Sequence, residues 1–237
     1  MPPRVDVVPA ARFARAALDE LMALAARYAH PVVGLPTGKT PVGLYEELAR
    51  LAAGGRADVR LWRPFAIDEY VGMRSHPCSN RAFFARYWNA IPGAAAVEQF
   101  DPEAADLEAE ATAFAGRLAK AGGLDIAVLG IGMNGHVAFN EPGSLRDSTA
   151  RVVTLHSESR ASAAACWGDE TPTRGLTLGL VELLAAPSVL LLADGAAKAG
   201  IVARALRGLI SPDCPASFLQ EHPGLTVVLD EAAGRSL

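Results

Sequence analysis

Cysteine is scarce in this sequence, and its scarcity excludes several classes of protein. The 237 residues include three cysteines, Cys78, Cys166 and Cys214, and no two of them form a CxxC pair. Secreted domains that depend on disulfides are much richer in cysteine, and cysteine-based zinc sites need closely paired ligands. We therefore expect three reduced thiols in a cytoplasmic protein, with Cys78 inert.

The sequence also lacks an excess of positive charge, a long apolar run and metal-ligand spacing. Its 22 Lys and Arg residues against 26 Asp and Glu residues give a net charge of −4, which argues against a nucleic-acid or anionic-membrane partner. The longest apolar stretch is interrupted by Asp194, Lys198 and Arg204, so no segment reaches the length of a membrane-spanning helix. The five histidines are not spaced as metal ligands, and we expect no bound metal.

Hydrophobic residues make up 51% of the chain, and they follow two alternating patterns. Short apolar runs predict strands at 31–35, 59–67, 124–129, 187–193 and 225–229. Helical spacing predicts helices at 10–29, 41–53, 80–90, 102–121, 176–186 and 196–209. Such alternation predicts an α/β fold, a single doubly wound, Rossmann-like domain over residues 1–237 with a mostly parallel sheet flanked by helices. We expect one strand and one helix within 144–174, which is the candidate for a lid.

Polar residues gather in four segments that each follow a predicted strand, namely 36–40, 68–72, 130–141 and 194–198. The carboxyl ends of parallel strands share one edge of a sheet, and open α/β sheets bind ligands at that edge. The segments therefore predict a single crevice. It would contain Thr37, Lys39, Thr40, Asp68, Glu69, Asn134, His136, Glu141 and Lys198.

The first of these segments suits a phosphate group. It is not a nucleotide-binding P-loop, because Val33 stands where that motif requires its first glycine. Gly38, Lys39 and Thr40 nevertheless lead directly into a predicted helix, whose backbone amides and dipole favour an anion, and Lys39 adds a positive charge. The alternative is an ordinary strand–helix turn with a capping threonine.

The third segment suits acid–base chemistry. Glycines at 130, 132 and 135 match the spacing of a dinucleotide-binding loop, but His136 follows them instead of a clear helix. We interpret the glycines as allowing the backbone to approach a ligand. Glu141 lies near enough in sequence to orient the His136 ring and support its charged form. The alternative is a hydrogen-bonded structural histidine.

Asp68 and Glu69 close the predicted strand at 59–67. A carboxylate beside apolar walls tends towards a raised pKa and can act as a base, whereas a turn-capping aspartate is the alternative. Taken together, the segments predict an enzyme that acts on a small phosphorylated metabolite by acid–base chemistry, without a metal or a nucleotide.

Three segments resemble the signatures of the glucosamine-6-phosphate deaminase family: 34–41 (GLPTGKTP), 67–72 (IDEYVG) and 130–143 (GIGMNGHVAFNEPG). The block from His136 to Pro142 is specific to that family, whereas the Thr-Gly-x-Thr-Pro loop is shared with the related 6-phosphogluconolactonases. The resemblance covers nearly the whole chain. It implies the fold of the superfamily that includes ribose-5-phosphate isomerase and coenzyme A transferases.

The resemblance also implies a reaction, in which glucosamine 6-phosphate and water become fructose 6-phosphate and ammonia without a cofactor. By analogy, His136 opens the sugar ring with help from Glu141 and Asn134. Asp68 then moves a proton between C2 and C1 through an enolamine. The phosphate would be held by Thr37, Gly38, Lys39, Thr40 and Lys198.

The sequence departs from the family pattern at several positions. Family members carry Asp or Asn at position 134, and usually Gly or Ser at position 39. They also place a phosphate-binding arginine after a run of small residues, which here reads Ala163 to Cys166 without an arginine. We hypothesise that Lys39 supplies the missing charge. Val153 stands where allosteric members carry a lysine, so we do not expect activation by an N-acetylated sugar phosphate.

Two alternatives stay open, and a third is disfavoured. A 6-phosphogluconolactonase is one, because Ser79 and Asn80 resemble that group; a deaminase for a related amino-sugar phosphate, such as galactosamine 6-phosphate, is another. A sugar-phosphate sensor without turnover is disfavoured, because the sheet pattern begins by residue 31 and leaves no room for a DNA-binding segment. The oligomeric state, monomer or homo-oligomer, is not indicated by the sequence.

Overall fold

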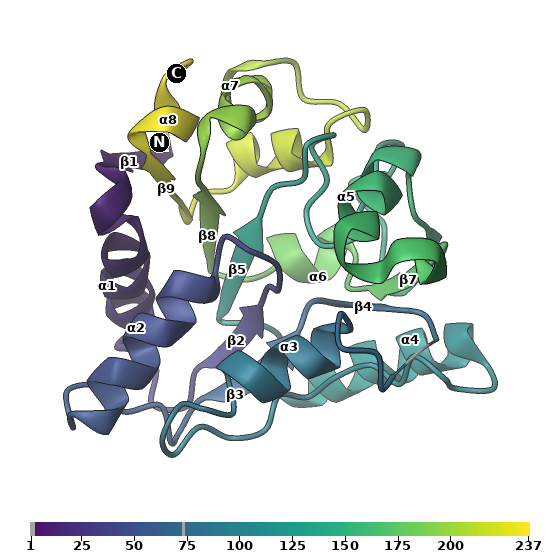
Figure 1. The fold of residues 1–237 in the computed structure, drawn as a ribbon, viewed down its shortest axis with the longest axis horizontal. Coiled ribbons are helices and arrows are strands. Elements are labelled where there is room, and N and C mark those ends of the chain that lie inside the picture. Colours follow the sequence, from purple (N-terminus) through teal and green to yellow (C-terminus); the bar gives the residue numbers. More distant parts are fainter. Residues whose placement is uncertain (1–2, 73) are drawn as a thin grey trace.

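The central sheet has six parallel strands in the order β1–β9–β8–β5–β2–β3 (Figure 1). The computed structural model describes residues 3–72 and 74–237. Every residue of β8 and β9 is buried, as is typical of parallel strands that are covered on both faces. The six strands are β1 (Arg4–Val8), β2 (Val32–Leu35), β3 (Arg63–Ala66), β5 (Ile126–Gly130), β8 (Ser188–Ala193) and β9 (Leu225–Asp230).

Helices cover both faces of this sheet. On one face, α1 (Phe13–Ala25), α2 (Val42–Ala53) and α3 (Asn80–Tyr87) share a core with Ile126 and Val128 of β5. On the other face, α4 (Leu107–Lys120), α6 (Leu180–Leu184) and α7 (Ala199–Arg207) share a core with Ala127 and Leu129. Successive residues of a strand thus face opposite layers, and the predicted fold class is confirmed. None of the described helices is long and apolar enough to cross a lipid bilayer.

A second, antiparallel sheet of three strands stands beside the first, in the order β4–β7–β6. It is made of β4 (Asp68–Tyr70), β7 (Arg174–Thr177) and β6 (Arg151–Thr154). The predicted strand at 59–67 is therefore too long, and the predicted helix at 176–186 begins in a strand. Short apolar runs are ambiguous between the two structures, which explains the second error. The edge strand β1 was not predicted.

The segment 144–174 contains the strand β6 and the α-helix α5 (Ser157–Trp167), as expected, and β7 begins at its last residue. In Figure 1, α5 lies on the opposite side of the view from α1 and α2. Short 3-10 turns and a terminal helix complete the chain: η1 (Ala10–Arg12), η2 (Gly168–Glu170), η3 (Ala196–Lys198), η4 (Pro215–Glu221) and α8 (Glu231–Gly234).

The prediction of three reduced thiols is wrong for two of them. Cys78 and Cys166 form a disulfide, with 6.0 Å between their Cα atoms, whereas Cys214 is free and buried. The two bonded cysteines are 88 residues apart in sequence. Spacing alone gives no sign of such a pair, and only the fold brings the Cα atoms within the range that a disulfide requires.

Candidate active site

The loops that follow β2, β3, β5 and β8 line one cavity of about 410 Å³ at the carboxyl edge of the parallel sheet. Helix α5 forms a further wall, with Ser159, Ser162 and Ala163. Glu141 lies behind His136, and Glu69 caps helix α3 instead of facing the cavity. The other predicted site residues line it: Thr37, Gly38, Lys39, Thr40, Asp68, Asn134, His136 and Lys198.

Asp68 is a buried carboxyl group at the cavity wall, only 8% exposed. Its pKa is raised to about 8, chiefly by burial and further by the neighbouring charge of Glu69, while a hydrogen bond from Asn80 opposes the shift. Asp68 begins β4 instead of ending the preceding strand, so the chain passes from one sheet to the other at this residue. A carboxyl group with this pKa is a stronger base, once ionised, than an exposed aspartate.

Asn80, at the start of α3, connects Asp68 to the loop after β2. Its Nδ2 donates to Asp68 Oδ1 over 2.6 Å and to the Asp68 carbonyl over 3.0 Å, while its Oδ1 accepts from Thr37 Oγ1 over 2.9 Å. Glu69 fixes the helix start, because its carboxylate accepts the backbone N–H groups of Asn80 and Arg81 at 3.0 and 2.9 Å. The position of the buried carboxyl thus depends on the amide of Asn80.

His136 is held through one ring nitrogen. Its Nδ1 lies 3.4 Å from Glu141 Oε2 and 3.1 Å from Ser159 Oγ of α5. The other nitrogen, Nε2, has no hydrogen-bond partner within residues 3–72 and 74–237. Burial works to raise the pKa of Glu141, but the hydrogen bond and charge of His136, aided by Ser159 and Asn134, outweigh it and bring that pKa to about 2. Glu141 is therefore ionised at neutral pH.

Asn134 makes hydrogen bonds to both Glu141 and His136. Its Nδ2 donates to Glu141 Oε2 over 2.8 Å, and its Oδ1 accepts the backbone N–H of His136 over 3.2 Å. An ionised aspartate has no hydrogen to donate, so the amide is the side chain that suits a permanently charged Glu141.

Two of the three glycines of the 130–135 loop lie against other side chains of the protein. A Cβ at Gly132 would collide with the His136 ring, and one at Gly135, where φ is +88°, would press on Cys214 Sγ at 2.6 Å. Both glycines therefore make room for the protein's own side chains. Only Gly130 has open space around its Cβ position.

Two lysines, Lys39 and Lys198, also line the cavity. Lys198 is half-buried, its Nζ donates to the Ile131 carbonyl over 2.6 Å, and burial lowers its pKa against the opposing charge of Asp194. Thr40 Oγ1 donates to Asp194 Oδ1 over 2.5 Å, whereas Lys39 is exposed at the rim. Among the cavity-lining residues that the structure describes there is no arginine.

Two groups able to transfer protons, Asp68 and His136, thus face one cavity from different loops. A base and a histidine in this arrangement can shift a proton between adjacent carbons and open a cyclic hemiacetal. In the described part of the chain, no three His, Cys, Asp or Glu side chains are grouped to hold a metal ion.

Sequence comparisons identify the family of the chain. The model of the family described as glucosamine-6-phosphate isomerases/6-phosphogluconolactonase matches residues 8–228. The chain belongs to this family. Similar relatives include the glucosamine-6-phosphate deaminases of Cutibacterium acnes, 40% identical over 94% of this chain and 87% of the relative, and of Mycolicibacterium smegmatis, 40% identical over 95% and 89%.

Solved structures of the glucosamine-6-phosphate isomerase/6-phosphogluconolactonase family show how far the similarity extends. A monomeric glucosamine-6-phosphate deaminase has a TM-score of 0.93 and 32% identity, over 99% of this chain and 100% of that one. A 6-phosphogluconolactonase from Trypanosoma brucei has a TM-score of 0.77 and 21% identity, over 99% and 98%, which demonstrates the shared fold.

Two polar side chains of the cavity region, Asn80 and Ser159, were not predicted as site residues. Asn80 was noticed only as part of a Ser-Asn pair typical of lactonases, although its position one residue after a helix-capping serine is a usable signal. Ser159 carries no signal of its own, because a serine in an exposed, alanine-rich helix is unremarkable until the helix is seen to lie against His136.

Proposed function

We propose that this chain is a glucosamine-6-phosphate deaminase, which converts glucosamine 6-phosphate and water to fructose 6-phosphate and ammonia in the cytoplasm. The observation that carries the proposal is the placement of a buried carboxyl of raised pKa, Asp68, and a carboxylate-bound histidine, His136, at one cavity. The names of the relatives at about 40% identity support the deaminase over the lactonase activity of the family.

The first step is the opening of the pyranose ring. His136 moves the proton from the O1 hydroxyl to the ring oxygen through Nε2, while Glu141 stabilises the charged imidazole at Nδ1 over 3.4 Å. Asn134 and Ser159 keep the two side chains in place. The products of this step are an aldehyde at C1 and a free hydroxyl at C5.

The second step is the isomerisation. Asp68 removes the proton from C2 of the open-chain sugar while the C2 ammonium group gives a proton to O1, which yields an enolamine. Asp68 then returns its proton to C1, which leaves an iminium group at C2. Water then adds to the iminium carbon at C2, and ammonia leaves as the ketone forms. Asn80 positions the Asp68 carboxyl for both transfers through its 2.6 Å hydrogen bond.

The phosphate binds at the loop of Thr37, Gly38 and Thr40, between Lys39 and Lys198. No arginine is among the described residues that line the cavity, so Lys39 supplies the second positive charge there, beside that of Lys198. We expect Lys39→Ala to raise the KM for glucosamine 6-phosphate by about tenfold or more, the value of one charge-assisted hydrogen bond, with kcat little changed. Steady-state kinetics of Lys39→Ala and of Lys120→Ala, an exposed lysine outside the cavity, would test this. An unchanged KM in Lys39→Ala would remove Lys39 from the phosphate site.

The activity itself is tested by following fructose 6-phosphate and ammonia together after glucosamine 6-phosphate is added. Equal amounts of both products are expected. Galactosamine 6-phosphate and 6-phosphogluconolactone are offered in parallel, because they represent the amino-sugar and lactonase alternatives. Turnover of the lactone without release of ammonia from glucosamine 6-phosphate would refute the proposal.

A further inference from the structure

The disulfide joins helix α5, a wall of the cavity, to the segment that precedes Asn80. Cys78 lies two residues before Asn80, the side chain that holds Asp68, and Cys166 lies in the last turn of α5. The same helix presents Ser159 to His136 at its other end. One covalent bond therefore connects the segment that positions the carboxyl base with the helix that contacts the histidine.

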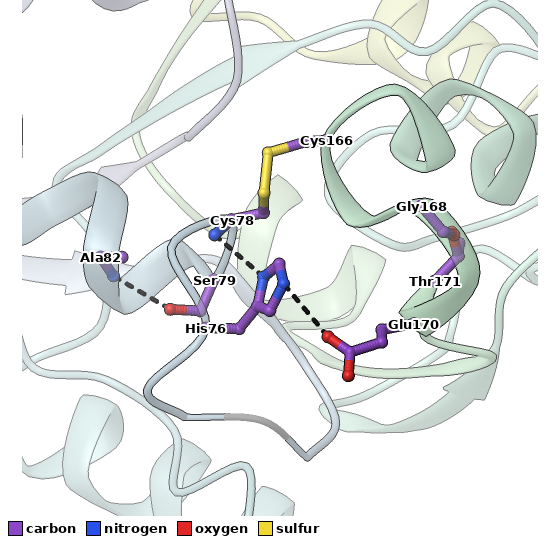
Figure 2. The surroundings of a disulfide bond; sticks show 8 residues. All are labelled: His76, Cys78, Ser79, Ala82, Cys166, Gly168, Glu170 and Thr171. Atoms are coloured by element: carbon purple, nitrogen blue, oxygen red, sulfur yellow. Dashed lines mark hydrogen bonds and ion pairs between the residues drawn. A yellow bond between two sulfur atoms is a disulfide. The ribbon is translucent and has the colours of Figure 1, made fainter.

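Apart from the disulfide, the end of α5 is held mainly by the contacts of one buried residue. Trp167 is its one buried residue among eleven, all of which the structure describes. The Trp167 ring stacks on His76 with 4.1 Å between centroids, and it meets Tyr70 edge-on at 5.2 Å. His76 also approaches Glu170, just after the helix, at 3.5 Å. Figure 2 shows His76, with its contact to Glu170, beside the disulfide, so the bond and the non-covalent contacts form one attachment point.

The bond is also within reach of a reductant. Cys166 is exposed and Cys78 is half-exposed, whereas Cys214 is buried. Disulfides in cytosolic proteins are typically transient and redox-sensing, because the surrounding thiol pool reduces permanent ones. An accessible disulfide that is attached to a wall of the cavity, in a protein for which we propose a cytoplasmic location, fits that class.

We propose that Cys78 and Cys166 are a thiol–disulfide exchange site that clamps α5 against the cavity in the oxidised state and releases it in the reduced state. A dithiol transfers two electrons and two protons to the bond between the sulfur atoms, which separates into two thiols, and the dithiol becomes a cyclic disulfide. Release of α5 withdraws Ser159 from His136 and opens the wall that contains Ser162 and Ala163. The effect on catalysis rests on the proposed function, whereas the effect on the helix does not.

Hydrogen exchange of the wild-type protein tests the clamp without any assay of activity. After air oxidation, denaturation in the presence of a thiol reagent should reveal one free thiol, and after treatment with dithiothreitol it should reveal three. Amides of residues 157–167 should exchange at least about tenfold faster in the reduced protein, because the covalent part of their attachment is lost. Exchange in the core strand β8 serves as the internal reference. Three free thiols after oxidation, or equal exchange of 157–167 in the two states, would overturn the proposal.

Two variants test whether reduction of the disulfide changes the rate of turnover. Cys166→Ser should behave as the reduced protein and should no longer respond to dithiothreitol, whereas Ala164→Ser, an equally exposed change in the same helix, should respond as the wild type does. In the wild type, kcat/KM for glucosamine 6-phosphate should fall by about fivefold or more on reduction, a typical size for coupling between two sites. Faster exchange without a change in kcat/KM would contradict the regulatory part. A protein that turns over no glucosamine 6-phosphate in either state, but shows the exchange difference, would refute the proposed function and leave the clamp standing.

Discussion

Replacement of Asp68 by asparagine is expected to lower kcat for glucosamine 6-phosphate by about a hundredfold to ten-thousandfold, the usual contribution of a general base. Asparagine has nearly the same shape and can still accept the hydrogen bond from Asn80, but it cannot take a proton from C2. The measurement is steady-state release of ammonia by Asp68→Asn, with Asp213→Asn, an exposed aspartate, as the matched control. A decrease of less than about threefold would assign the proton transfer to another group.

The pH dependence of the wild type gives an independent view of the same carboxyl. The base must be ionised to act, and the pKa of Asp68 is about 8. We therefore expect kcat/KM to rise about tenfold per pH unit below pH 8 and to level off above it. The profile should lose this inflection in Asp68→Asn.

Stability should change in the opposite direction to activity. The pKa of Asp68 is about 8 in the folded protein, against about 3.9 for an unfolded aspartate, so between these values the folded state holds a proton that the unfolded state has lost. The free energy of unfolding then falls as pH rises through this window. Asp68→Asn lacks this carboxyl group, so its free energy of unfolding does not fall for this reason. The difference in Tm between Asp68→Asn and the wild type should therefore increase from pH 5 to pH 8. A variant that is inactive and also less stable at pH 8 would indicate a structural role instead.

The sequence allowed the position of the candidate site to be predicted because the argument depends on topology, not on side-chain detail. Once the strands at 31–35 and 124–129 are taken as parallel neighbours, the loops after them must lie at one edge. Thr37 and His136 indeed line the same cavity, although 99 residues separate them in the sequence. The buried character of Asp68 followed in the same way from the apolar run before it.

The strand pairing within the smaller sheet could not be foreseen. The pairing of β4 with β7 depends on backbone hydrogen bonds between segments that have no matching pattern, such as Glu69 opposite Leu176. The disulfide has the same origin, because Cys78 and Cys166 approach each other only after α5 has been placed on this side of the molecule. The interaction of Ser159 with His136 is likewise a consequence of tertiary structure.

Replacement of His136 by glutamine is the second change for which a large effect is expected, a decrease in kcat of about a hundredfold to ten-thousandfold. Glutamine can donate a hydrogen bond, but it cannot carry a proton from O1 to the ring oxygen. Glu141 would also lose its imidazole partner, although Asn134 would still donate to it over 2.8 Å. The measurement is ammonia release by His136→Gln, with the exposed His30→Gln as the matched control.

The pH profiles of the two variants distinguish the role of Asp68 from that of His136. In His136→Gln the carboxyl of Asp68 is intact, and burial still raises its pKa, so the residual activity should keep the inflection near pH 8. In Asp68→Asn that inflection should be absent at any level of residual activity. If the profile of His136→Gln were also flat, the inflection would belong to the histidine and its carboxylate partner. The assignment of Asp68 as the base for C2 would then be wrong.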